Sequence, residues 1–106
     1  MTIFALSSGP GMAGIAVIRV SGKNTAEVIK KLTGSKLPTP RVATLKKFNK
    51  NGSKEIIDEG VVLWFPGPNS YTGEDLAEFH VHGSRAIINA MHSSISKIRN
   101  CRMAEP

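Results

Sequence analysis

The spacing of apolar residues changes several times along this chain, and these changes limit the folds open to it. Short apolar or alternating segments predict strands at 2–6, 14–20, 41–48, 55–65 and 76–81. Two other segments, 25–32 and 85–100, repeat apolar residues at helical steps. The order β, β, α, β, β, β, α predicts an α+β domain with a mixed sheet covered by two helices. Arg102 is expected to begin a last strand.

Turn-forming and capping residues set the expected boundaries of these elements. Asn24 or Thr25 can cap the first helix, and Gly34 ends it. The pair Asn51-Gly52 is the clearest hairpin signal, because both residues can adopt the positive φ values that a tight turn requires. The segment 14–20 is apolar almost throughout, as in strands buried on both faces, and Arg19 is its exception.

Length and composition fit one soluble domain covering residues 1–106. Fourteen basic and eight acidic residues give a net charge of +6, which suits an anionic partner or simply a solvated basic surface. The single Cys101 cannot form an internal disulfide, and we interpret it as a small apolar residue. Neither 2–6 nor 14–20 resembles a signal peptide or a membrane span. We therefore expect a cytoplasmic chain without a membrane partner.

Three segments together carry a family resemblance. The first comprises Thr2-Ile3-Phe4-Ala5, Gly9-Pro10-Gly11 and Gly14-Ile15-Ala16-Val17-Ile18-Arg19-Val20-Ser21-Gly22. The second is Leu63-Trp64-Phe65-Pro66-Gly67-Pro68-Asn69-Ser70-Tyr71-Thr72-Gly73-Glu74-Asp75, and the third is Glu78-Phe79-His80-Val81-His82-Gly83-Ser84. In these motifs and their spacing the chain resembles the N-terminal domain of the TrmE/MnmE family of tRNA-modifying GTPases. The similarity extends over essentially the whole chain and is weakest between Ser35 and Lys54.

The resemblance implies a fold similar to the folate-binding domain of the glycine-cleavage T-protein. It implies a homodimer that binds 5-formyl- or methylene-tetrahydrofolate near the dimer interface. The parent protein would work with a flavoprotein of the GidA/MnmG family on the wobble uridine of certain tRNAs. A helical domain and a G domain would follow, so residues 1–106 are expected to be a truncated form.

The chain lacks the phosphate-binding loop that a GTPase needs. At the nearest run, Gly22-Lys23-Asn24, Val17 replaces the first glycine of the motif and Asn24 has no hydroxyl to bind Mg²⁺. GTP, Mg²⁺ and K⁺ are therefore expected only in the G domain, and this chain is assigned no catalytic residue.

Arg19, Glu78 and Tyr71 are the candidate ligand-binding residues. The resemblance places Arg19 and Glu78 at ligand-contacting positions, and a charge on an apolar strand is costly unless it is paired. A carboxylate suits the amino and ring N–H donors of a pterin, and a guanidinium suits the carboxylates of a glutamyl tail. Arg19 and Glu78 pairing with each other is the alternative. Tyr71 can stack on a pterin or pack back on the sheet.

Other polar residues have both a functional and a purely structural interpretation. Glu78, His80 and His82 share one face of a strand, a set that zinc accepts, but no fourth ligand is evident, so solvated histidines are favoured over a metal site. The loop 8–14 can bring backbone N–H groups near a ligand, although a plain turn is favoured. Glu74 and Asp75 are interpreted as a polar pair preceding a strand.

Two other functions remain as alternatives. A stand-alone folate-dependent one-carbon transferase would need an acid–base group, for which only His80, His82, Glu74 and Asp75 are available. A small basic RNA-binding domain is suggested by the charge, but the chain lacks the exposed aromatic pairs and basic runs of such domains.

Overall fold

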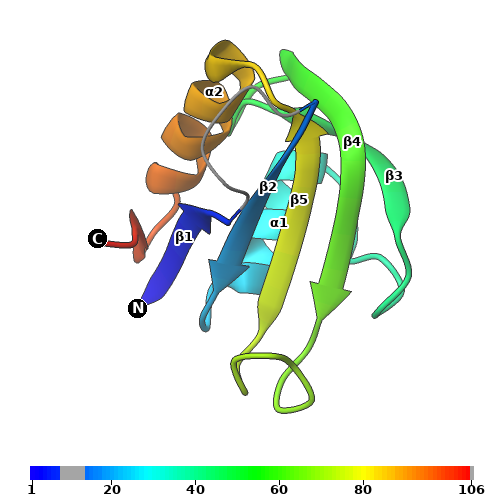
Figure 1. Cartoon of the computed structure of the whole chain (residues 1–106), viewed down its shortest axis with the longest axis vertical. Helices are drawn as coiled ribbons and strands as arrows, with labels where there is room; N and C mark the ends of the chain where they lie inside the picture. The colour runs from blue at the N-terminus through cyan, green and yellow to red at the C-terminus, as the bar shows by residue number, and fades with distance from the viewer. Residues whose placement is uncertain (8–13, 106) are drawn as a thin grey trace.

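The strands form one mixed sheet in the order β3-β4-β5-β2-β1-β6. The computed structural model describes residues 1–7 and 14–105 (Figure 1). The strands are β1 (Thr2–Leu6), β2 (Ile15–Ser21), β3 (Thr44–Asn49), β4 (Ile56–Phe65), β5 (Leu76–His82) and β6 (Cys101–Met103), and the helices are α1 (Thr25–Thr33) and α2 (Arg85–Ser96). Neighbouring strands run antiparallel, apart from β1 and β6, which are parallel. The predicted α+β class, mixed sheet and helices are confirmed.

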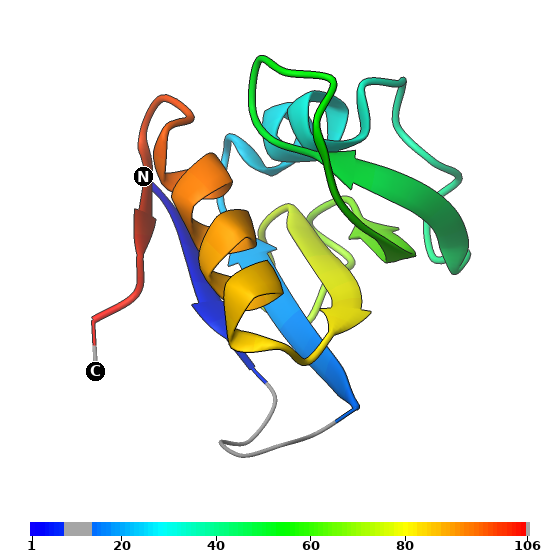
Figure 2. The ribbon, with the colours of Figure 1, turned by 90° about the horizontal axis from the view of Figure 1, so that it is seen from above.

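Both helices pack on the same face of the sheet, and the core lies between the helices and the sheet (Figure 2). Alternate strand residues point to that face, so one side of each central strand is buried. Phe79 of β5 meets Phe48 of β3 edge to face, with ring centroids 5.4 Å apart. The apolar stripe of α2 is buried at Met91 and Ile95, and the chain beyond the helix adds Ile98. The apolar residues that recur at helical steps in this segment thus belong to the core.

The strand β2 is buried on one face only, which corrects the expectation of a strand buried on both. Ala16, Ile18 and Val20 are buried, whereas Ile15 is exposed and Arg19 is partly exposed. An apolar run therefore does not prove two covered faces, because single apolar side chains are common at protein surfaces.

Two predicted boundaries move by three residues or more because of local backbone geometry, and one predicted turn differs in its φ values. The strand expected from Arg41 begins at Thr44, since Arg41 has a φ of 65° that no strand residue adopts. The helix expected to reach Asn100 ends at Ser96, and Asn100 itself has a φ of 61° at the turn into β6. In the β3–β4 hairpin only Gly52, and not Asn51, takes a positive φ.

The first helix begins where the sequence placed it, but without the expected side-chain cap. Asn24 occupies the capping position, yet its side chain makes no capping hydrogen bond and instead donates to Glu27. The Thr25 hydroxyl donates to the carbonyl of Gly22 over 2.7 Å. Gly34 ends α1 in the left-handed conformation, as predicted.

The helices and Cys101 can be compared with what the sequence predicted for membrane spans and for the thiol. In the part of the chain that the structure describes, neither helix has the length and apolar character needed to cross a bilayer. Cys101 is buried, and burial raises the pKa of its thiol, in keeping with its interpretation as an apolar residue. The glycine-bearing loop lies, apart from Gly14, outside the described residues, so its role is untested.

Candidate ligand-binding site

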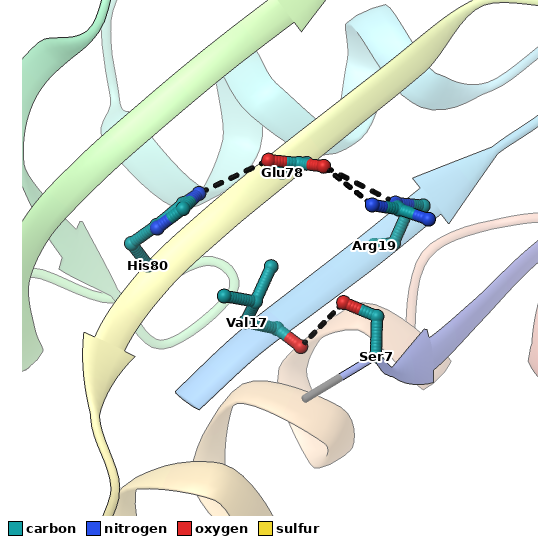
Figure 3. Close-up of polar contacts among 5 residues, drawn as sticks. All are labelled: Ser7, Val17, Arg19, Glu78 and His80. Carbon is teal, nitrogen blue, oxygen red and sulfur yellow. Dashed lines mark hydrogen bonds and ion pairs between the residues drawn. The ribbon is translucent and has the colours of Figure 1, made fainter. Parts of the chain in front are cut away.

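The two charged residues singled out by the sequence meet on the face of the sheet opposite the helices. The antiparallel register places Arg19 of β2 directly across from Glu78 of β5. The Nη2 of Arg19 donates to Oε2 of Glu78 over 2.7 Å, and its Nε donates to the same oxygen over 3.2 Å (Figure 3). The side chains are 39% and 16% exposed, respectively. The pairing that the sequence left open as an alternative is therefore present.

A third side chain completes the contacts of the Glu78 carboxylate. His80 lies two residues further along β5, on the same face, and its Nε2 donates to Oε1 of Glu78 over 3.1 Å (Figure 3). Burial raises the pKa of Glu78, but the hydrogen bonds from Arg19 and His80 outweigh burial and leave the pKa below its usual value. Glu78 is therefore an ionised acceptor at neutral pH.

Arg19 and Glu78 also line a common hollow of about 280 Å³. Its other walls come from the end of β4, the start of β5, the connection between them and the connection between α1 and β3: Arg41, Phe65, Asn69, Ser70, Tyr71 and Leu76. Tyr71 is 87% exposed, and its ring centroid lies 5.6 Å from the guanidinium carbon of Arg19. The alternative in which Tyr71 packs back on the sheet is therefore wrong.

The connection between β4 and β5 is held in place by the polar residues that precede β5. Asp75 accepts a hydrogen bond from the backbone N–H of Gly67 over 2.9 Å. Glu74 accepts one from the hydroxyl of Ser21 over 3.1 Å. Both carboxylates thus position the loop that carries Tyr71. Glu74 and Asp75 are therefore more than a polar pair preceding a strand.

The histidines of β5 are engaged separately and do not converge. The Nδ1 of His82 lies 3.0 Å from both carboxylate oxygens of Asp58, and its backbone N–H donates to Asp58 over 2.8 Å. Burial raises the pKa of Asp58, but hydrogen bonds from His82 and Glu59 lower it below its usual value. Within residues 1–7 and 14–105, no three His, Cys, Asp or Glu side chains gather as metal ligands.

The acid–base groups that a stand-alone transferase would use have partners within the domain. His80 bonds Glu78, His82 bonds Asp58, Glu74 bonds Ser21, and Asp75 bonds Gly67. Such side chains hold the fold and the site in place.

Sequence reasoning missed Arg41 and Asp58. Arg41 was expected inside a strand, and its positive φ leaves no trace in the sequence. Asp58 lies on β4, 24 positions before His82, so only the sheet brings the two together. Asn69 and Ser70 also line the hollow, and their place in the same loop as Tyr71 was a signal that could have found them.

Comparisons with known proteins point in one direction. The family model described as "GTP-binding protein TrmE N-terminus" matches residues 2–106. The "tRNA modification GTPase MnmE" of Pelagibacter ubique is 67% identical over 106 residues, which is all of this chain and 24% of that protein. The mitochondrial "5-taurinomethyluridine-[tRNA] synthase subunit GTPB3" of Danio rerio is 50% identical, over 98% of this chain and 21% of that protein. The MnmE of Brucella anthropi is also 50% identical, over 98% of this chain and 23% of its own length. The chain thus spans about a quarter or less of these relatives.

Proposed function

This chain belongs to the TrmE N-terminal family, and on that premise we propose that residues 1–106 are the tetrahydrofolate-binding and dimerisation domain of a tRNA-modifying GTPase. The parent would be a cytoplasmic enzyme acting on the wobble uridine of tRNA together with a GidA/MnmG-type flavoprotein. Its GTP, Mg²⁺ and K⁺ sites would lie in a separate G domain. The printed names of the relatives support tRNA modification and GTPase activity of the parent.

The observation that carries the proposal is the hollow with an ionised glutamate at its wall. Glu78 is held by Arg19 and His80, and its Oε1 keeps acceptor capacity because it takes only one of those hydrogen bonds. The amino and ring N–H groups of a reduced pterin are donors that match such an acceptor. The exposed ring of Tyr71 offers an aromatic surface beside it.

The size of the hollow supports a small ring system with the remainder of the ligand outside. About 280 Å³ is near the lower end of the range for small-molecule sites. A bound 5-formyl- or methylene-tetrahydrofolate would supply a one-carbon unit. The residues of this chain would bind and orient that cofactor, in a fold proposed to be related to the glycine-cleavage T-protein.

The face that carries the hollow also supports dimerisation. Ile3, Ile15 and Leu45 have alternate strand positions on that face and are 41%, 60% and 65% exposed. Exposed apolar side chains around a polar site are typical of surfaces that meet a partner. A second copy of the chain would cover them, and sedimentation of the purified chain at increasing concentration tests this.

Isothermal titration with 5-formyl-tetrahydrofolate tests the ligand. Glu78→Gln should weaken binding about 10- to 100-fold, because a charge-assisted hydrogen bond is worth roughly 1.5–3 kcal/mol. Arg19→Ala should weaken it as well, since Glu78 loses its main support. The matched control is Glu59→Gln, the same change at an exposed position of β4 that does not line the hollow.

Equal affinity of Glu78→Gln and the parent chain would refute the site, and no binding by the parent chain would refute the ligand. A parallel titration with tRNA at two salt concentrations tests the RNA-binding alternative. Salt-sensitive binding of tRNA without binding of the folate would favour that alternative.

A further inference from the structure

Arg41 lines the hollow and has a backbone conformation that an arginine rarely adopts. Its φ of 65° lies in the left-handed region, where a Cβ crowds the carbonyl oxygen. Its N–H donates to the carbonyl of Trp64 over 2.8 Å, which ties this residue to the end of β4. Its guanidinium carbon lies 5.7 Å from the centroid of the Phe65 ring. The surrounding contacts therefore fix both the backbone and the side chain at the wall of the hollow.

Glycine or asparagine would adopt this backbone conformation at less cost than arginine. Residues held in such conformations cluster at ligand-binding sites, where the position of the side chain matters more than the energy cost of the backbone conformation. The side chain at 41 does not serve the core, because Arg41 is exposed. This backbone strain thus places a charged group beside the ligand site.

The two arginines of the hollow differ in how their charges are compensated. Arg19 is paired with Glu78. Arg41 has no carboxylate within ion-pair distance among residues 1–7 and 14–105. Its guanidinium therefore keeps hydrogen-bonding capacity for an anion.

The segment around Arg41 reinforces that positive charge. Six of the 14 basic residues and none of the eight acidic ones lie between positions 36 and 54, so the rest of the chain carries eight of each. The whole net charge of +6 thus belongs to the connection after α1, the edge strand β3 and its hairpin. Clustered charge of one sign attracts an oppositely charged ligand.

We infer that Arg41 receives a carboxylate of the pocket's ligand, while Arg19 stays paired with Glu78 and holds that acceptor for the ligand's N–H donors. The planar guanidinium can bind a carboxylate through two parallel hydrogen bonds. The inference rests on the proposed function, because a reduced folate carries N–H donors at one end and glutamyl carboxylates at the other. It assigns the acidic end to a residue that the sequence did not single out.

Titrations with two ligands that differ only at the acidic end test this assignment. The first is tetrahydrofolate without a one-carbon group, and the second is 6-methyltetrahydropterin, which lacks the aminobenzoyl-glutamate tail. Arg41→Ala should weaken folate binding about 10-fold or more and leave pterin binding unchanged. The matched control Lys54→Ala removes the same charge from the same segment, outside the hollow, and should leave both unchanged.

Arg41→Gly guards against a folding defect, since glycine accepts a positive φ without strain. It should bind folate as weakly as Arg41→Ala and unfold at no lower urea concentration than the parent chain. Arg41→Lys should recover part of the affinity, because lysine keeps the charge without the fork. An equal loss for both ligands, or no loss for either, would overturn the inference.

A third titration separates this inference from the proposed function. If the parent chain binds neither pterin compound, the proposed ligand is wrong, and glutarate then tests Arg41 alone. A change in the ¹⁵Nε chemical shift of Arg41 on adding glutarate, with no change at Arg19, supports the anion site. No change at Arg41 overturns it.

Discussion

The two faces of the sheet are built from the same strands, yet they are used differently. On β5, Phe79 points to the helices and is 0% exposed, while its neighbour Glu78 points to the other face and lines the hollow. On β2, Ile18 and Arg19 divide in the same way. The helix-covered face gains its stability from apolar burial, whereas the other face carries charges that hold one another. The buried core and the candidate ligand-binding site therefore reside in alternate residues of the same strands.

The sharpest way to break the covered face is Phe79→Ala. This change removes a ring that is 0% exposed and packs against Phe48. The free energy of unfolding should fall by about 3–5 kcal/mol, because the lost burial and the new cavity both destabilise the fold. Urea unfolding followed by tryptophan fluorescence measures it through Trp64. A loss below about 1 kcal/mol would show that this face is not the main core.

Glu78→Gln, at the residue next to Phe79 but on the other face, should show that the two faces contribute differently to the free energy of unfolding. Its effect on the free energy of unfolding should stay within about 1 kcal/mol, because the pair with Arg19 is partly exposed and such pairs contribute little. The same urea experiment measures this. A loss comparable to that of Phe79→Ala would mean that the charged pair holds the fold together and not only the site.

Acid should destabilise the protein through the carboxylates of the open face and the strand ends. The pKa values of Glu78 and Asp58 are lower in the folded protein than usual. Their contribution to stability is therefore full above the unfolded pKa of about 4 and is lost as the pH falls through the folded pKa. Urea midpoints measured between pH 2 and 6 should decline toward acid.

Asp58→Asn provides the comparison for that acid dependence. Since asparagine does not titrate, the decline of the urea midpoint below about pH 4 should become shallower than in the parent chain. An identical slope in the two proteins would contradict a stabilising role for the contact of Asp58 with His82.

The smallest effect is expected at Leu45, on the open face of the edge strand. Leu45 is 65% exposed, so Leu45→Ser should change the free energy of unfolding by less than about 0.5 kcal/mol. If a second copy covers this face, the same change should weaken self-association in sedimentation experiments. A large loss of monomer stability would show that this face contributes to the core.

Much of the fold could be predicted because its signals are local. The helical spacing of Ile87, Met91 and Ile95 gave α2 and its buried side. The alternation of β5 placed Phe79 and Glu78 on opposite faces. Elements whose ends depend on distant contacts were less predictable: Arg41 was expected in a strand, but the hydrogen bond of its N–H to Trp64 fixes a different conformation.

The sequence by itself determined the order of the elements, because periodicity and turn chemistry are properties of short segments. Its resemblance to a known family, carried by three motifs, singled out Arg19 and Glu78 as candidate site residues. Only the tertiary structure decided that these two side chains pair, that Asp58 meets His82, and that Arg41 lines the same hollow. The physical reason is the register of the sheet. Hydrogen bonds between strands bring together residues 59 positions apart, and that separation leaves no pattern in the chain itself.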